Sequence, residues 1–167
     1  MDIATVAKLN GATVEEIKEQ YAIPANVPDP KDLPLARKYK ELHDSGRDDE
    51  IPYEAMELTT VVAEATRMCR LANGPEFFPL DLTGLQIGEV ALVGIPGEPF
   101  TGVGRGIKEA EGWTLVLPTC NTNAKEGYFP MLECYEEGGY EAGSSNFKAG
   151  VAELIIDAGL SLLEDLR

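Results

Sequence analysis

Apolar residues recur along this chain with two different spacings, and the spacing changes near Gly74. Before this point they lie three or four residues apart, as on one face of a helix. After it, short apolar runs are separated by Gly, Pro and Asn, which is typical of buried strands joined by tight connections. The pattern predicts a mixed α/β fold in one compact unit, with a helical portion over 1–82 and an α/β portion over 83–167.

Three helices are expected in the helical portion, over 13–21, 32–43 and 52–71. The first begins with Thr13-Val-Glu-Glu16, which has the form of a capping box. The second has Asp32 as its N-cap and a proline in its first turn. The third has an apolar stripe wide enough to predict a well-buried helix, formed by Ala55, Leu58, Val62, Ala65, Met68 and Cys69.

In the α/β portion, residues 77–89 are expected to form two strands or one bent strand. The apolar run Val90–Ile95 predicts a strand buried on both faces, and 114–117 a second short buried strand. A helix is expected from about 100 to 110. Residues 119–145 are rich in Gly, Tyr and Glu and are expected to form a long loop, and such loops are often functional. An amphipathic helix over 151–166 closes the chain, with these residues facing inward: Val151, Leu154, Ile155, Leu162 and Leu163.

The charge of the chain excludes some partners. With 14 Lys and Arg against 29 Asp and Glu, the net charge is −15 and the isoelectric point about 4.4. Nucleic-acid binding requires basic patches, which this balance does not provide. The three cysteines show no paired spacing, which indicates a reducing compartment rather than a disulfide framework. Neither a secretory signal nor an apolar run of about 20 residues is present, so a cytoplasmic protein without a transmembrane segment is expected.

His43 is the single histidine of the chain. It lies in Lys40-Glu-Leu-His43-Asp, which has the character of the last turn of a polar helix, where a cation is favourable. The chain alone is therefore expected to form neither a histidine-rich metal site nor a histidine-based catalytic triad.

The glycine-rich segment Gly102-Val-Gly104-Arg-Gly106 follows a strand and could be taken for a phosphate-binding loop. It lacks the lysine of a P-loop, and Ile107 replaces the third glycine of a dinucleotide fingerprint. A tight turn with close helix–sheet packing is favoured. Binding of a nucleotide or another small anion at Gly102–Gly106 stays open as an alternative.

Three side chains are candidates for chemistry. Glu98 follows Pro-Gly at the end of a buried strand, where a carboxylate can start a helix or point into a cleft as an oxygen ligand or general base. Tyr128 and Tyr140 each follow a glycine in the long loop. Loop tyrosines are more often packing residues, and the neighbouring polar residues Asn121, Glu126 and Glu141 are more often turn formers. Ser144-Ser145 lies in no nucleophile elbow.

These residues occur in a recognisable order. The succession Gly94-Ile-Pro-Gly-Glu98-Pro-Phe, Asn121, Gly127-Tyr128-Phe-Pro, Tyr135 and Gly139-Tyr140-Glu-Ala-Gly-Ser-Ser145 resembles the carboxyl-terminal half of the catalytic domain in the neutral/alkaline ceramidase family. The resemblance covers roughly 85–167, about half of the chain. Residues 1–82 contain no motif that we can match.

Members of that family are zinc-dependent amidases that hydrolyse the N-acyl bond of ceramide. Their zinc is held by two histidines, a glutamate and a tyrosine, with a serine nucleophile nearby. By motif position, the resemblance implies that Glu98 and Tyr128 are metal ligands and that Tyr140 hydrogen-bonds the substrate or the oxyanion. Carboxylate oxygen is an ordinary zinc ligand, and a zinc ion can lower the pKa of a phenol.

The family's histidines and nucleophile belong to an amino-terminal half that has no counterpart here. The resemblance therefore implies the carboxyl-terminal part of a longer zinc amidohydrolase, whose substrate is an N-acyl amide. We expect the isolated chain to be inactive and to retain no zinc. The alternatives are a non-catalytic structural or assembly fragment, and the small-anion module at Gly102–Gly106.

Overall fold

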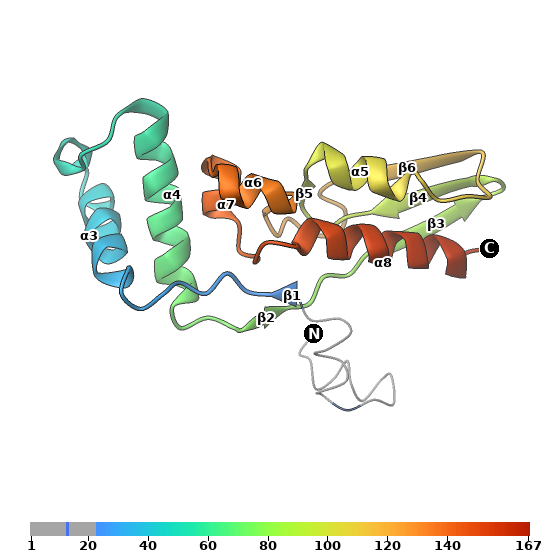
Figure 1. The fold of residues 1–167 in the computed structure, drawn as a ribbon, viewed down its shortest axis with the longest axis horizontal. Helices are drawn as coiled ribbons and strands as arrows, with labels where there is room; N and C mark the ends of the chain where they lie inside the picture. The colour runs from blue at the N-terminus through green and yellow to red at the C-terminus, as the bar shows by residue number, and fades with distance from the viewer. Residues whose placement is uncertain (1–12, 14–22) are drawn as a thin grey trace.

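A computed structural model describes residue 13 and residues 23–167. Figure 1 shows a pair of helices at one end and a small sheet flanked by helices at the other. The helices are α3 (Leu33–Asp44), η1 (Asp48–Glu50), α4 (Ala55–Leu71), α5 (Thr101–Ile107), α6 (Leu132–Glu137), α7 (Tyr140–Ser144) and α8 (Val151–Asp165). The strands are β1 (Ile23–Pro24), β2 (Phe77–Phe78), β3 (Thr83–Ile87), β4 (Val90–Gly94), β5 (Glu98–Pro99), β6 (Leu115–Thr119) and β7 (Tyr128–Phe129). The predicted mixed α/β fold is confirmed.

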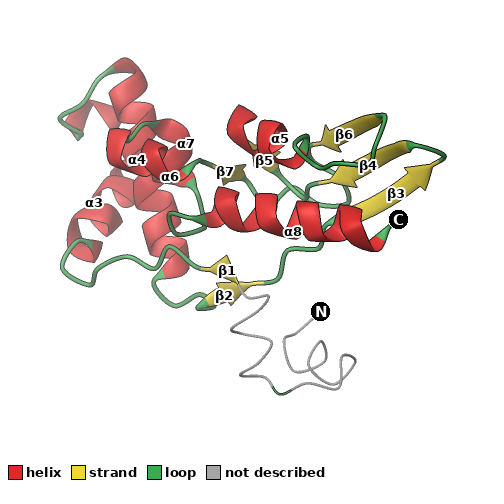
Figure 2. Ribbon diagram, turned by 45° about the vertical axis from the view of Figure 1, so that its right-hand side comes forward, coloured by secondary structure: helices red, strands yellow, loops and turns green. Residues whose placement is uncertain are grey.

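The strands form three small sheets (Figure 2). The largest has the order β3–β4–β6, in which β4 is antiparallel to β3 and parallel to β6. The two others are an antiparallel pair of β1 with β2 and a parallel pair of β5 with β7. The segment predicted as one bent strand or two is thus a short β2 followed by a separate β3. The predicted helix over 13–21 lies outside the described residues except for Thr13.

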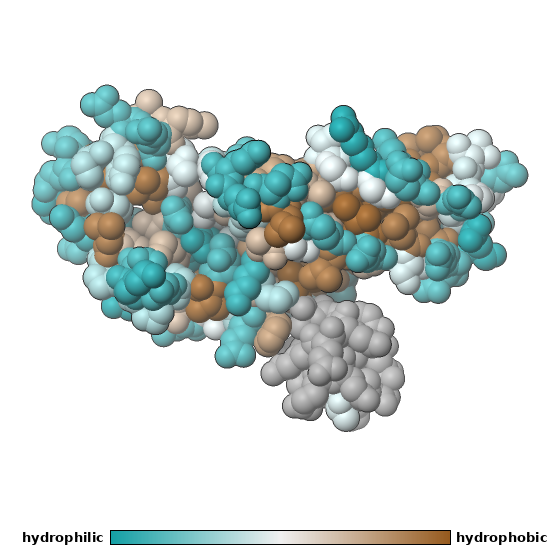
Figure 3. All heavy atoms as spheres, viewed as in Figure 1, coloured by the Kyte–Doolittle hydropathy of each residue, from teal (hydrophilic) through white to brown (hydrophobic). Residues whose placement is uncertain are grey.

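The main core lies between one face of the large sheet and the helices α5 and α8. Ala91, Val93 and Val116 point into it from the sheet, and Ile107, Ile155 and Leu163 from the helices. The two helices pack closely because glycines occur at their contact. A Cβ on Gly106 would lie 2.8 Å from the Ile156 side chain, and one on Gly159 would lie 2.9 Å from Ile107. Figure 3 shows hydrophobic side chains gathered around α5 and α8.

The other face of the large sheet is open. The register places Leu85 opposite Leu92 and Leu92 opposite Leu117, while Val90 lies between Ile87 and Leu115. These aliphatic side chains point away from the core, and the exposed fractions are 51% for Leu85, 63% for Ile87, 47% for Leu115 and 38% for Leu117. The prediction that Val90–Ile95 is buried on both faces is therefore wrong for the outer face, where Val90 and Leu92 are only half-buried. The prediction of a buried strand over 114–117 holds only for Val116. A short run of apolar residues does not show whether one face or both faces of the strand are covered by other parts of the chain.

The helical end of the molecule also differs from the expectation. Helix α4 has the predicted end at Leu71, but its first turns are exposed, and Met56 is 67% exposed. Its buried side is narrower than the apolar stripe, and these residues form it: Val62, Ala65, Arg67 and Leu71. In α8, Leu154 points outward and is 46% exposed, contrary to the prediction, whereas Ala152 and Gly159 are buried.

The segment 119–145 is not a plain loop, because it contains β7, α6 and α7. Helix α7 packs against α4, where Gly143 lies beside Thr60 and Glu64. The helical and α/β portions are therefore in direct contact. None of the helices in the described part of the chain is long and apolar enough to cross a membrane.

Candidate functional site

Glu98 and Tyr128 are neighbours in the parallel pair of β5 with β7. The register sets Glu98 directly opposite Tyr128 and Pro99 opposite Phe129. The Glu98 amide donates to the Gly127 carbonyl at 2.8 Å, and the Phe100 amide donates to the Phe129 carbonyl at 3.2 Å. Directly opposed residues of a strand pair place their side chains on the same face. The carboxylate and the phenol therefore lie side by side.

A glycine allows these two short strands to approach. A Cβ on Gly97 would lie 2.6 Å from the Gly127 carbonyl oxygen and 2.6 Å from the Phe129 ring. Real Cβ atoms do not come so close to backbone oxygen, so any larger residue would push β5 away from β7. Gly97 thus allows the segment that follows β4 to pack directly against the segment that contains Tyr128.

Tyr140 joins the pair from the first position of α7. Its ring is 6.0 Å from the Tyr128 ring between centroids, in an edge-to-face arrangement with planes inclined by 75°. The chain reverses before it at Gly138 and Gly139, with φ angles of 79° and 105°, which glycine adopts most readily. Glu98, Tyr128 and Tyr140 therefore form one cluster from three segments of the chain.

The cluster is electrostatically unfavourable for a free phenolate. Burial raises the pKa of Tyr128, and the nearby groups Glu98, Tyr140 and Glu141 raise it further. The Tyr128 hydroxyl is therefore protonated at neutral pH. A divalent cation among the same oxygen atoms would act in the opposite direction, because positive charge favours the phenolate.

The cluster can supply oxygen donors from one carboxylate and two phenols. Catalytic zinc sites use three protein ligands in most cases, usually with histidine among them. Within the described residues, no group of three or more His, Cys, Asp and Glu side chains could hold a metal ion. The donor set fits part of a zinc shell, and it is incomplete by itself.

His43 does not contribute to this cluster. It lies in the last turn of α3, as the sequence predicts, and its Nδ1 atom is 2.8 Å from a carboxylate oxygen of Asp48. Both residues lie at the helical end of the molecule, beyond α4 (Figure 1).

The glycine-rich segment Gly102–Gly106 lies inside α5. The Val103 amide donates to the Phe100 carbonyl at 3.0 Å, and the Lys108 amide donates to the Gly104 carbonyl at 3.3 Å. Gly102 and Gly106 leave room for Met131 and Ile156. The close packing that was predicted against the sheet occurs at these glycines against Met131 and α8 instead, and the predicted tight turn is wrong. The segment is part of a helix rather than a phosphate-binding loop.

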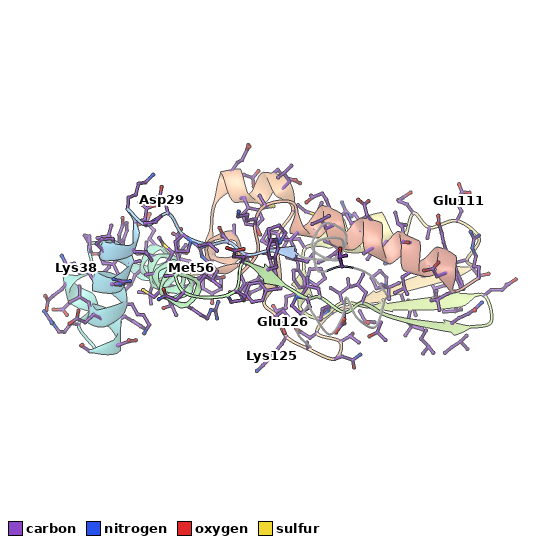
Figure 4. The ribbon with its side chains drawn as sticks, turned by 90° about the horizontal axis from the view of Figure 1, so that it is seen from below. Asp29, Lys38, Met56, Glu111, Lys125 and Glu126 are labelled. Carbon is purple, nitrogen blue, oxygen red and sulfur yellow. The ribbon has the colours of Figure 1, made fainter. Side chains whose placement is uncertain are left out.

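Of the polar residues predicted as turn formers, Asn121 and Glu126 lie in the connection from β6 to β7, whereas Glu141 lies in α7. Asn121 and Asn123 have positive φ angles of 48° and 64°, in a connection that runs from β6 to β7. Its backbone is fixed to the end of β4 by the Asn121 amide, which donates to the Gly97 carbonyl at 2.8 Å, and by the Glu126 amide, which donates to the Pro96 carbonyl at 2.8 Å. Lys125 and Glu126 lie on the side of the sheet away from α8 (Figure 4).

A cavity of about 310 Å³ lies at the other end of the sheet, between the connection after α5 and the end of α8. Glu111 and Trp113 line it together with Leu163 and Arg167. Figure 4 shows Glu111 well away from Glu126. The cavity is separate from the Glu98–Tyr128–Tyr140 cluster.

One polar residue behind the cluster is buried. Ser145 is 1% exposed, and its hydroxyl donates to the Tyr128 carbonyl at 3.0 Å. Sequence analysis considered Ser145 only as a nucleophile and missed this contact. Ser144 and Ser145 have the same side chain, so nothing in the sequence distinguishes the exposed from the buried hydroxyl.

Comparison with known proteins gives a partial likeness. No family model matches the chain, and no curated protein matches it. Among solved structures it is similar to neutral ceramidase from Pseudomonas aeruginosa, with 27% identity over 55% of this chain and a TM-score of 0.42. A ceramidase complexed with C2 gives the same values. The chain spans 16% of the length of each of these structures.

Proposed function

We propose that this chain forms the metal-facing part of a ceramidase-like, zinc-dependent amidohydrolase that cleaves an N-acyl amide. The observation that carries the proposal is the direct pairing of Glu98 with Tyr128, with the Tyr140 ring against them. The order of motifs around these residues resembles the ceramidase family. That resemblance and the pairing support the proposal independently, because motif order does not require the side chains to meet.

In this proposal each side chain has a separate task. Glu98 contributes a carboxylate oxygen to the metal, and Tyr128 contributes its phenol oxygen after losing its proton. Zinc, when bound, polarises the amide carbonyl and lowers the pKa of bound oxygen ligands. Tyr140 donates its hydroxyl hydrogen to the oxygen that becomes negative as the carbonyl is attacked.

The remaining ligands and the nucleophile would come from polypeptide outside this chain. His43 cannot replace them, since it lies in α3 beside Asp48. Two or three oxygen ligands alone hold zinc weakly. The isolated chain is therefore proposed to be inactive and to lose zinc on dialysis.

Two measurements test the proposal. In the longer protein, Glu98→Ala should abolish stoichiometric zinc and amide hydrolysis, whereas Glu109→Ala, an acid in the cavity at the other end of the sheet, should change neither. Unchanged zinc content and turnover in Glu98→Ala would contradict the assignment. Stoichiometric zinc in the dialysed isolated chain would contradict its being a partial site.

A non-catalytic structural or assembly fragment is a second candidate, and the open sheet face favours it. This face carries an apolar surface away from the Glu98–Tyr128–Tyr140 cluster, formed by Leu85, Ile87, Leu115 and Leu117. Large exposed apolar patches mark contact surfaces. If the longer protein binds no zinc while this face is buried in it, the structural role stands and the hydrolase is excluded.

A further inference from the structure

We infer that Ser145, supported by Tyr135, is a positioning residue for Tyr128. This inference rests on the proposed function, in which Tyr128 is a ligand, and it assigns the part of the chain that holds this ligand in place. It concerns the backbone of β7 rather than the phenol itself, so it can be tested without metal or substrate.

The short pair of β5 with β7 leaves one edge of Tyr128 without a strand neighbour. The carbonyls of Gly127 and Phe129 accept hydrogen bonds from β5. Because successive carbonyls of a strand point in opposite directions, the Tyr128 carbonyl points away from β5. There it accepts the hydroxyl hydrogen of Ser145 at 3.0 Å. Ser145 thus acts as the partner that a further strand would otherwise provide.

The Ser145 hydroxyl is itself fixed by a second layer of contacts. Its oxygen accepts from the Phe147 amide at 3.3 Å and lies 3.1 Å from the Tyr135 hydroxyl oxygen. The Tyr135 hydroxyl donates to the Phe147 carbonyl at 2.9 Å. With its single hydrogen directed to Tyr128, Ser145 accepts from the Phe147 amide. The Tyr135 hydroxyl, whose own hydrogen goes to the Phe147 carbonyl, lies against the Ser145 oxygen and holds Phe147 in place. The hydroxyl therefore has one orientation.

Asn146, the residue after Ser145, restrains the same segment at Glu126, which lies two positions before Tyr128. The Asn146 side-chain amide donates to the Glu126 carbonyl at 3.2 Å, and its carbonyl oxygen accepts from Arg70 of α4. Residues 126–128 are thus attached on one side to Pro96–Glu98 and on the other to Ser145–Asn146. Tyr140 lies in α7, which ends at Ser144, so the same short segment connects both tyrosines of the cluster.

The consequence is that Ser145 sets the position of the Tyr128 phenol relative to Tyr140 and Glu98. Without the hydroxyl, the Tyr128 carbonyl has no partner and β7 can shift outward. The phenol would then become more exposed and lie farther from the acidic groups that face it, which are Glu98 from β5 and Tyr140 and Glu141 from α7.

The test uses the full chain with tyrosine labelled with carbon-13 at Cζ, and the Tyr128 signal is assigned by its loss in Tyr128→Phe. In Ser145→Ala the Overhauser contact between the Tyr128 and Tyr140 rings should weaken, and the Tyr128 Cζ signal should move toward that of an exposed tyrosine. Ser144→Ala is the matched control, because the Ser144 hydroxyl donates to the Glu141 carbonyl and not to Tyr128. A folded Ser145→Ala with the ring contact and Cζ signal of the unmodified chain would overturn the inference.

Tyr135→Phe keeps the test decisive if Ser145→Ala does not fold. This change retains the ring and removes the hydroxyl beside Ser145, so the contact between the Tyr128 and Tyr140 rings should weaken by a smaller amount. No change in Tyr128 in a folded Tyr135→Phe would overturn the part assigned to Tyr135. Because no metal is used, failure of this test leaves the zinc proposal standing, and loss of the zinc proposal leaves the positioning intact.

Discussion

Glu98 and Tyr128 lie directly opposite each other in a parallel pair of strands, each of which has only two residues. So short a ladder has little stability of its own, and its geometry depends on what surrounds it. Gly97 permits the close approach from one side, and Ser145 restrains the other. The predictions below examine these supports and the surfaces around them.

Replacing Gly97 by alanine should destabilise the protein by about 1–3 kcal/mol, because the added carbon overlaps the Gly127 carbonyl and the Phe129 ring. Urea unfolding measures the free energy of unfolding. Gly104→Ala is the control within the same region, since a Cβ there meets nothing within 4 Å and α5 is helical. It should stabilise by about 0.5–1 kcal/mol. Equal effects of the two changes would show that the approach at Gly97 is not tight.

The stability of the chain should fall at alkaline pH. The folded-state pKa values of Tyr128 and Tyr135 are both raised, chiefly by burial. The unfolded chain therefore loses these protons first, so stability is full below about pH 10 and is lost as the pH rises through the folded pKa values. Thermal unfolding over this range measures the effect.

Tyr128→Phe should reduce that alkaline loss, because the group that resists ionisation is removed. Tyr53→Phe is the comparison, since Tyr53 is 39% exposed and packs only edge-on against Tyr39 among the aromatic contacts of the described residues. An alkaline profile that is the same in both variants would contradict the assignment to Tyr128.

The open sheet face should bind apolar dyes. Ile87→Thr together with Leu117→Thr should lower the fluorescence of bound anilinonaphthalene sulfonate, while the free energy of unfolding changes by only about 0.5 kcal/mol, as for surface positions. Val93→Thr on the core face should instead cost more than 1 kcal/mol, because it buries an additional hydroxyl. A large loss of stability in the double variant would show that these side chains are packed in the chain itself.

The helical and α/β portions should unfold together. Arg67 of α4 is 6% exposed and donates to the Asn26 carbonyl at 2.8 Å. The Asn26 amide in turn donates to the Asn146 carbonyl of the α/β portion at 2.8 Å, and Arg70 bonds the Asn146 side chain. Arg67→Met should therefore destabilise the protein by about 1–3 kcal/mol, because the half-buried Asn26 carbonyl loses its donor. The exposed Arg105→Met should have almost no effect. Two separate transitions in differential scanning calorimetry would contradict this coupling.

Sequence analysis located most helices correctly because their signals are local. Asp32 and Pro34 mark the start of α3, and the apolar spacing over 55–71 marks α4. Asp32 makes no capping hydrogen bond through its side chain, so the position was right although the expected contact is absent. The orientation of Leu154 was predicted wrongly, since two adjacent aliphatic residues on a helix cannot be assigned to core and surface by pattern alone.

The candidate cluster was predicted in part. Glu98, Tyr128 and Tyr140 were selected through motif order, and their roles as ligands and hydrogen-bond donor remain proposals. Their proximity could not be derived from spacing, because it depends on a parallel pairing between segments that are distant along the chain.

The sequence by itself determined the longer helices α3, α4 and α8 and the chemistry that each side chain can offer, because these depend on local backbone preferences and on residue type. The tertiary structure decided which faces of the strands are covered, which of two adjacent serines is buried, and that Glu98 meets Tyr128 and Tyr140. Burial and long-range pairing are properties of the packed chain as a whole, and no local pattern specifies them.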